Sequence, residues 1–207
     1  NDIWSYPGYK ERDILPGDYK YEDWNGDGEI NGQDEHPFAF DQTPWLQFSL
    51  NAGLQWKNLD FNMLLQGSAL GSMEYKEPLH EIWGKNGGGA LKQFLDRWHP
   101  VDPKADPYDP STVWTSGHYA YTGRWAKNNS AFNRVSTAYL RLKSIELGYT
   151  FPKLKQIPNA SLRIYANAYN LLTFTGVKFV DPEHPDDDLG RMYPLNKTYT
   201  LGVSLSF

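Results

Sequence analysis

The sequence of 207 residues contains no cysteine. This absence excludes a disulfide framework, a thiolate zinc site and a cysteine nucleophile. Long apolar runs are also missing, because the mean hydropathy is −0.65 and no stretch of roughly 18 apolar residues occurs, so a transmembrane helix is excluded. A membrane β-barrel is not excluded, since its strands are apolar on one face only.

Basic residues are scarce at the start of the chain. Residues 1–44 contain three basic and eleven acidic side chains, whereas the remainder contains seventeen basic and fourteen acidic ones. No basic stripe with interleaved aromatic residues is present, which argues against a nucleic-acid partner. The acidic first segment favours a cation as its partner.

No catalytic constellation is present. The five histidines have no metal-ligand spacing, and no nucleophile motif accompanies them. The sequence therefore predicts that the chain is not an enzyme and has no catalytic residues. These histidines are His36, His80, His99, His118 and His184.

Strict alternation of apolar and polar residues predicts an all-β chain. In the first strand, Leu46 and Phe48 share one face while Gln47 lies on the other. The pair at 57–58 predicts a tight antiparallel hairpin, and a change of parity near Lys143-Ser144 predicts a β-bulge. The expected strands are 45–56, 59–70, 137–150, 161–170 and 199–207.

Strand length and loop length together favour a transmembrane barrel. Several expected strands reach the nine to eleven residues needed to cross a bilayer at a tilt. Short connections at 57–58 and 151–160 alternate with long ones at 71–136 and 171–198, as in outer-membrane barrels. We therefore expect residues 1–44, 71–136 and 171–198 to be extracellular loops and the C-terminus to be periplasmic.

Five strands are too few to close a barrel, for which about eight is the practical minimum. We therefore expect the rest of the barrel upstream of Asn1, which opens the chain in mid-pattern. The final residue, Phe207, ends an alternating strand and fits a barrel-assembly signal.

One segment matches the pattern of a calcium loop. Side-chain oxygens at positions one, three, five and twelve, a backbone carbonyl at position seven and a glycine at position six are the features of that pattern. Here Gly28 is the glycine, and Ile30 at position eight is expected to anchor the loop. The alternative is an Asn/Gly/Asp-rich surface turn without metal. The candidate ligands of a structural Ca²⁺ are Asp23, Asn25, Asp27, Glu29 and Asp34.

Aromatic residues gather at strand ends and in the long loops. Those near strand ends fit the aromatic belts that barrels place at the lipid interface; they are Trp45, Trp56, Tyr139, Tyr149, Tyr165 and Tyr169. Loop aromatics such as Trp114 and Tyr119 suit stacking on sugar rings or peptide side chains. Packing of the loop against itself needs the same residues, and for any single one we favour this structural role.

Several motifs together resemble a known family, the SusC/RagA group of TonB-dependent outer-membrane transporters of Bacteroidetes. The resemblance runs through nearly the whole chain. It is carried by the stretches 17–34 (GDYKYEDWNGDGEINGQD), 97–100 (RWHP), 139–152 (YLRLKSIELGYTFP), 163–165 (RIY), 170–175 (NLLTFT), 181–183 (DPE), 193–194 (YP) and 199–207 (YTLGVSLSF).

This resemblance implies a plugged barrel of about 22 strands, of which the chain is the C-terminal part with its last five strands. It implies import of glycan oligosaccharides or peptides across the outer membrane. It also implies a SusD-like surface lipoprotein as partner, contact with outer-membrane lipid, and energy coupling to TonB through an upstream part. The competing interpretation is a secreted soluble β-sandwich that binds carbohydrate and has a calcium-stabilised loop.

Overall fold

The computed structural model of the chain describes residues 14–76, 79–80, 82, 90–121, 130–152, 160–184 and 190–207. These residues form two compact units. One unit comprises residues 1–38 and 74–134, and the other comprises residues 39–73 and 135–207. We call the first the loop unit and the second the sheet unit. No helix among the described residues has the length and apolarity to cross a membrane.

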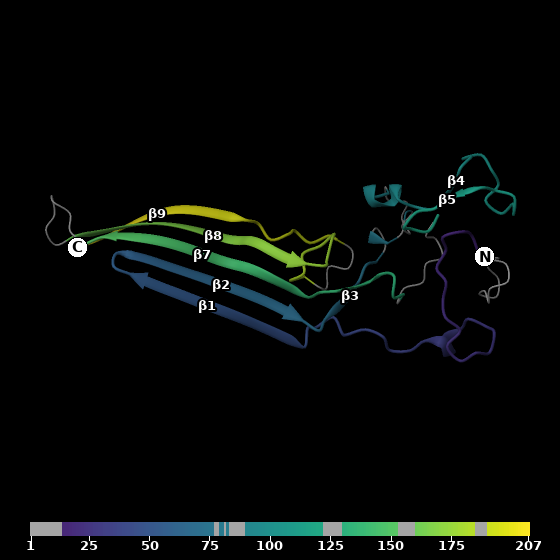
Figure 1. The fold of residues 1–207 in the computed structure, drawn as a ribbon, viewed down its shortest axis with the longest axis horizontal. Coiled ribbons are helices and arrows are strands. Elements are labelled where there is room, and N and C mark those ends of the chain that lie inside the picture. Colours follow the sequence, from purple (N-terminus) through teal and green to yellow (C-terminus); the bar gives the residue numbers. More distant parts are fainter. Residues whose placement is uncertain are drawn as a thin grey trace. The chain divides into compact units, whose positions relative to one another are not determined.

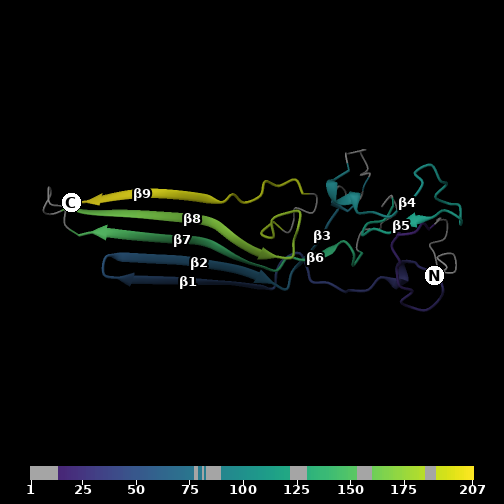
Figure 2. The ribbon, with the colours of Figure 1, turned by 45° about the horizontal axis from the view of Figure 1, so that its top comes forward.

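The sheet unit is built on one antiparallel sheet with the strand order β1-β2-β7-β8-β9, as Figures 1 and 2 show. Its strands are β1 (Leu46–Trp56), β2 (Leu59–Ala69), β7 (Tyr139–Phe151), β8 (Ser161–Thr175) and β9 (Thr198–Ser206). Successive strands are neighbours, as in an up-and-down barrel wall. The all-β prediction is therefore confirmed.

The predicted tight hairpin joins β1 to β2. Trp56 pairs with Leu59, so only two residues form the turn. Lys57 adopts a positive φ of 56° there, as the turns that suit the twist of a hairpin require. The ammonium group of Lys57 lies 4.8 Å from the ring centroid of Trp56.

The predicted bulge lies in β7. Leu65 pairs with Leu142 while Leu64 pairs with Ser144, so Lys143 is an extra residue relative to β2. The pairing with β8 shifts at the same place. An extra residue reverses the parity of a strand, and this is why Leu142 and Ile145 lie on the same face of the sheet.

Strand β8 is longer than expected. It continues to Thr175, whereas the alternation predicted an end at 170. Asn170 has a φ of 52° and lies where the register between β7 and β8 shifts, so the pairing resumes beyond it. The ends of the other four strands lie within two residues of the expected ones. Most of the turn expected at 151–160 lies outside the described residues.

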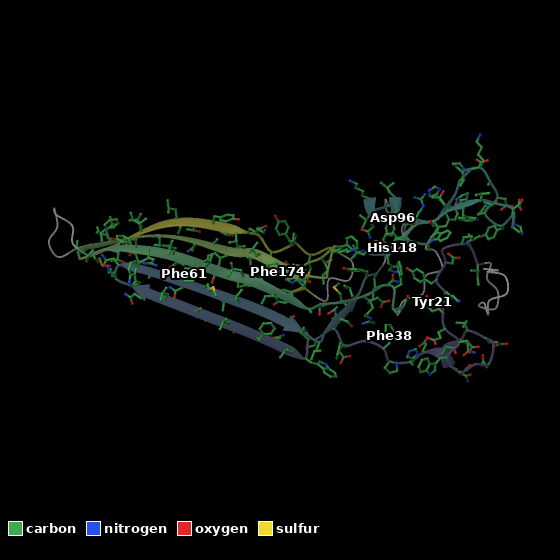
Figure 3. All side chains as sticks on the ribbon, viewed as in Figure 1. Tyr21, Phe38, Phe61, Asp96, His118 and Phe174 are labelled. Atoms are coloured by element: carbon green, nitrogen blue, oxygen red, sulfur yellow. The ribbon has the colours of Figure 1, made fainter. Side chains whose placement is uncertain are left out.

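The sheet has one apolar and one polar face. Many side chains on the apolar face are exposed; Leu201 is 77 % exposed and Leu50 is 56 % exposed. Phe61 of β2 and Phe174 of β8 are labelled in Figure 3. The apolar face consists of Leu46, Phe48, Leu50, Ala52, Leu54, Trp56, Leu59, Phe61, Met63, Leu65, Leu140, Leu142, Ile145, Leu147, Tyr149, Leu162, Ile164, Ala166, Ala168, Leu172, Phe174, Tyr199, Leu201, Val203 and Leu205.

The segments expected to be loops contain short ordered elements. These are the 3₁₀ helices η2 (Gly32–Asp34) and η4 (Lys92–Leu95) and the short strands β3 (Ser72–Glu74), β4 (His99–Pro100), β5 (Trp114–Thr115) and β6 (Arg134–Ser136). Strand β4 pairs with β5, and β3 pairs with β6. The division between the two units runs through β3 and β6.

Residues 14–38 pack against residues 90–121 and 130–134 through an aromatic cluster in the loop unit. The ring of Phe132 lies 4.9 Å from those of Tyr19 and His118, and Phe94, which is 1 % exposed, lies 4.9 Å from Tyr119. These aromatic residues pack the loops against themselves.

Candidate functional site

The polar face of the sheet carries an ion-pair network centred on Arg163 of β8. Its guanidinium donates to both carboxylate oxygens of Asp60 in β2, with an Nε to Oδ1 distance of 3.1 Å. It also donates to Glu146 of β7 at 2.7 Å. The Arg163 side chain is 27 % exposed. The network therefore ties together three strands whose partners are up to 103 residues apart in the sequence.

Gly148 makes this network possible. It pairs with Asp60 on one side and with Tyr165 on the other. A Cβ at position 148 would collide with the side chains of Arg163 and Asp60. The guanidinium of Arg163 instead spans the glycine and lies 4.8 Å from the ring centroid of Tyr165.

A second and more buried network is centred on Arg141 of β7. Its guanidinium donates to both oxygens of Asp181, at 2.8 and 2.9 Å, and to Glu183 at 2.7 Å. Lys143 also contacts Glu183, at 2.7 Å. The Arg141 side chain is 3 % exposed and that of Asp181 is 9 % exposed. These contacts fasten the segment that follows β8 to the polar face of β7.

Two tyrosines predicted for the interfacial belt have other contacts. Tyr139 lies beside Arg141, with 5.6 Å between the guanidinium carbon and the ring centroid, and its hydroxyl accepts from Gln66 at 3.2 Å. Tyr165 covers Arg163. By contrast, Trp56 is 63 % exposed and Tyr149 is 41 % exposed, and both lie on the apolar face near the hairpin end of the sheet.

The candidate calcium loop is folded around its acidic side chains. Asp23 accepts from the backbone amides of Gly26 and Gly28, at 2.7 and 2.8 Å. Asn25 accepts from the amide of Asp27 at 2.9 Å, and Asp27 accepts from that of Glu29 at 2.8 Å. The side-chain oxygens of positions one, three and five therefore point into the turn of their own loop.

Asp34 closes this loop. Its carboxylate accepts from the amides of Trp24 at 2.9 Å and Asn31 at 2.8 Å. The amide hydrogen bonds, that from Asn31 above all, hold the pKa of Asp34 below its ordinary value. Gly28 has a φ of 85°, in agreement with the predicted sharp turn, and Ile30 is 7 % exposed, in agreement with an anchoring role.

The described residues contain no cluster of three or more acidic, histidine or cysteine side chains arranged as metal ligands. The carboxylates of Asp23, Asp27 and Asp34 are held by backbone amides instead. A carboxylate has about four lone-pair positions. Asp23 and Asp34 each accept three hydrogen bonds and Asp27 accepts two from the described residues. Each of these three carboxylates therefore has at least one lone-pair position that accepts none of these hydrogen bonds.

The histidines do not form a site among the described residues. His118 and Asp96 are neighbours (Figure 3), since the amide of His118 donates to the carbonyl of Asp96 at 3.0 Å. His36 stacks on Trp24 with 3.9 Å between ring centroids. Burial raises the pKa of Tyr119, beside His118 in the aromatic cluster. These contacts are structural ones within the loop unit.

Comparison with known proteins identifies the chain's relatives. It is 28 % identical over 211 residues to TonB-dependent receptor P3 of Formosa agariphila, covering 94 % of the chain and 19 % of the receptor. It is also 28 % identical over 215 residues to TonB-dependent receptor P26 of the same organism, covering 97 % and 20 %. No family model matches the chain.

The chain is similar to TonB-dependent receptors over nearly all of its length. It spans about a fifth of the length of these relatives. The resemblance recognised from its motifs is therefore confirmed. Because the relatives are TonB-dependent receptors and not enzymes, the prediction of no enzymatic activity is confirmed as well.

Solved structures give the same fold. A chain of the RagAB peptide transporter superposes with a TM-score of 0.62 at 23 % identity, covering 87 % of this chain and 19 % of that chain. The RagAB peptide importer in its closed-closed state gives 0.62 at 22 % identity, covering 93 % and 21 %. The five-stranded sheet therefore has the fold of part of these transporter barrels. The soluble β-sandwich was the wrong alternative.

The barrel fold gives each face of the sheet its environment. In such barrels the apolar face contacts lipid and the polar face lines the lumen. A barrel of that kind would therefore have the networks of Arg141 and Arg163 on its lumen side. TonB-dependent receptors are outer-membrane barrels, and this is the location that the relatives indicate for the chain.

Proposed function

We propose that the chain forms the C-terminal strands and loops of a TonB-dependent importer that carries glycan oligosaccharides or peptides across the outer membrane. The observation that carries this proposal is similarity to TonB-dependent receptors over 94–97 % of the chain. The strand order β1-β2-β7-β8-β9, with a lipid-facing and a lumen-facing side, supports it further.

The orientation follows from the loops. We propose that residues 1–44, 71–136 and 171–198 are extracellular and that the C-terminus is periplasmic. The ordered loop unit is joined to the end of the sheet at which β1 begins, while the two-residue turn lies at the opposite end. This asymmetry is the one that outer-membrane barrels have.

The partners are a SusD-like surface lipoprotein, which binds on the extracellular side, and TonB, which acts through an upstream part of the protein. The structural neighbours are named as RagAB assemblies, which supports a second component. Exposed side chains in the loop unit, such as Trp24 at 58 % and Val113 at 69 %, supply apolar surface for it.

Co-purification tests the partnership. The full-length protein, affinity-tagged and extracted from outer membranes in mild detergent, is predicted to carry a surface lipoprotein in near-equal amount. The same extract from cells that express an unrelated tagged barrel is the control. Recovery of the full-length protein alone under several detergents would contradict this part of the proposal.

Substrate binding tests the transported class. The full-length protein with its lipoprotein is titrated in a calorimeter with short peptides and, separately, with oligosaccharides. Binding of one class is the expected result. The neighbours named as peptide importers favour peptides, and exposed aromatics such as Tyr108 suit either class. Binding of neither class would overturn the proposed import function.

We also propose that the loop at residues 23–34 binds a structural Ca²⁺. Asp23, Asn25, Asp27 and Asp34 would supply side-chain oxygens, and Glu29 its backbone carbonyl. The ion would hold together the two ends of the loop, which Asp34 already connects through its hydrogen bond to the amide of Trp24.

Terbium luminescence tests this site, because Trp24 within the loop can sensitise a bound Tb³⁺. Sensitised emission from the full-length protein is predicted to fall in Asp27→Asn and in Trp24→Phe. Asp106→Asn is the matched control, since Asp106 also accepts a backbone amide, from Tyr108 at 2.9 Å, but lies outside the motif. Equal emission from all the proteins, or no displacement of Tb³⁺ by Ca²⁺, would exclude the site.

A further inference from the structure

The lipid-facing surface is hollowed over strand β8. A groove of about 470 Å³ lies between β7 and β9, two strands that flank β8 in both views of the ribbon (Figures 1 and 2). It is lined by Ile145, Leu147, Ala166, Asn167, Ala168, Tyr199, Thr200 and Leu201.

The register explains the shape of the groove. Ala168 lies between Ile145 and Tyr199, and Ala166 lies between Leu147 and Leu201. Two methyl side chains therefore form the floor, while branched or aromatic side chains form the walls. Ala168 is only 8 % exposed, whereas Tyr199 is 68 % exposed. The groove is short, because the next side chain on this face of β8 beyond Ala166 is the bulkier Ile164.

A positive charge lies beyond one end of the groove. Lys197 is exposed and stands two residues before Tyr199, at the loop end of β9. The side chain of Asn170 donates to the carbonyl of Asn196 at 3.0 Å, which keeps this part of the chain beside β8. Among the described residues, Lys197 has no salt-bridge partner.

We propose that this groove is a binding site for one acyl chain of a phosphate-bearing membrane lipid, whose phosphate contacts Lys197. The groove is continuous with the lipid-contacting face of the barrel, so hydrocarbon is the medium that reaches it. The phenol of Tyr199 lies between apolar groove and charged end, as aromatic residues do at the membrane interface. This inference rests on the barrel fold and not on what is transported.

Native mass spectrometry of the full-length protein, released from mild detergent with its retained lipids, tests the site. Four variants are compared. Ala166→Leu with Ala168→Leu fills the groove, Ala52→Leu makes a like change elsewhere on the lipid-facing surface, and Lys197→Gln removes the charge. Lys104→Gln, in the loop between β4 and β5, is the control for charge alone.

The groove-filling pair is expected to weaken retention of the lipid about ten-fold, the effect of losing burial of one or two methylene groups. Lys197→Gln is expected to lose phosphate-bearing lipids selectively, and both controls are expected to retain them. Unchanged retention in Lys197→Gln, which lies outside the strands and leaves the barrel intact, would overturn the proposal. If the groove-filling variant loses a dimer but keeps its lipid, the groove binds a second copy of the protein, and the proposal is overturned.

Discussion

Two arginines of the polar face differ in burial, and this difference predicts their contributions to stability. Arg141 is almost fully buried against Asp181 and Glu183, so Arg141→Gln leaves two carboxylates without their guanidinium and is expected to cost about 3–5 kcal/mol. Arg163 is partly exposed, and Arg163→Gln is expected to cost only about 1 kcal/mol. Urea unfolding of the full-length barrel in lipid vesicles measures the free energy of unfolding of both variants. Equal losses of this free energy would contradict the prediction that the more buried arginine contributes more.

A glycine on the polar face provides a second prediction. Gly202 of β9 pairs with Tyr165, and a Cβ there would collide with the tyrosine ring. Gly202→Val is therefore expected to lower the free energy of unfolding by about 1–3 kcal/mol through overpacking. Gly176→Ala is the control, because a Cβ at that position meets nothing within 4 Å. The same urea experiment distinguishes the two variants. An unchanged free energy of unfolding in Gly202→Val would be inconsistent with this packing.

Asp34 makes the loop at 23–34 sensitive to acid. Its pKa is lower in the folded loop than the ordinary value of about 3.9, chiefly because of the amide hydrogen bond from Asn31. Its stabilising contribution is therefore fully present above the ordinary value and is lost as the pH falls through the lowered one.

We expect the amides of Trp24 and Asn31 to exchange hydrogen faster once the pH falls below the ordinary pKa of aspartate. The measured rates are first corrected for the intrinsic pH dependence of exchange. Asp34→Asn is expected to exchange fast already at neutral pH, with little further change on acidification. Protection that persists unchanged in Asp34→Asn would show that other contacts hold the loop.

Within each strand, the alternation of apolar and polar residues predicts which side chains face lipid. A charged substitution at a lipid-facing position is expected to destabilise the barrel. Val203 is 65 % exposed on the lipid-facing side of β9, so Val203→Arg is expected to cost about 2–4 kcal/mol near the bilayer midplane. Val203→Ser is the uncharged control, and Ser204→Arg places the same charge on the lumen side. Heat-modifiable mobility of the full-length protein reports folding. Equal folding of Val203→Arg and Val203→Ser would show that Val203 does not face lipid.

The strands could be predicted because alternation is a local property of the sequence. Even the bulge at Lys143 followed from a parity change within β7. The end of β8 could not, since it depends on Asn170 adopting a positive φ and on pairing beyond it with β7. The Arg163 network also escaped prediction, because Asp60 is 103 residues away and only the register brings them together.

In the candidate sites, too, local features could be predicted from the sequence, whereas contacts between distant residues could not. The turn at Gly28 and the anchor at Ile30 follow from local spacing. The Arg141 network left only a weak signal, namely Arg141 and Lys143 on one strand and an Asp-Pro-Glu stretch after the next. Packing of the two loop segments into one unit depends on aromatic contacts such as that between Tyr19 and Phe132, and the sequence provides no register for such contacts.

At the scale of the whole molecule, the sheet has two open edges, β1 and β9. Strands of eleven and nine residues with unpaired outer edges favour addition of further strands, and the relatives are about five times longer than the chain. In the proposed function the chain would form one wall of a larger barrel, with its polar networks on the lumen side and its groove toward lipid.

The proposed function requires the apolar face of this wall to contact lipid in the assembled barrel. Single cysteines at positions 200–205 of β9, spin-labelled in the full-length protein in bilayers after any other cysteines are removed, test it most directly. Labels at 201, 203 and 205 are expected to be accessible to lipid-soluble oxygen, and those at 200, 202 and 204 to a water-soluble nickel reagent. Absence of this alternation, or its reversal, would contradict the account.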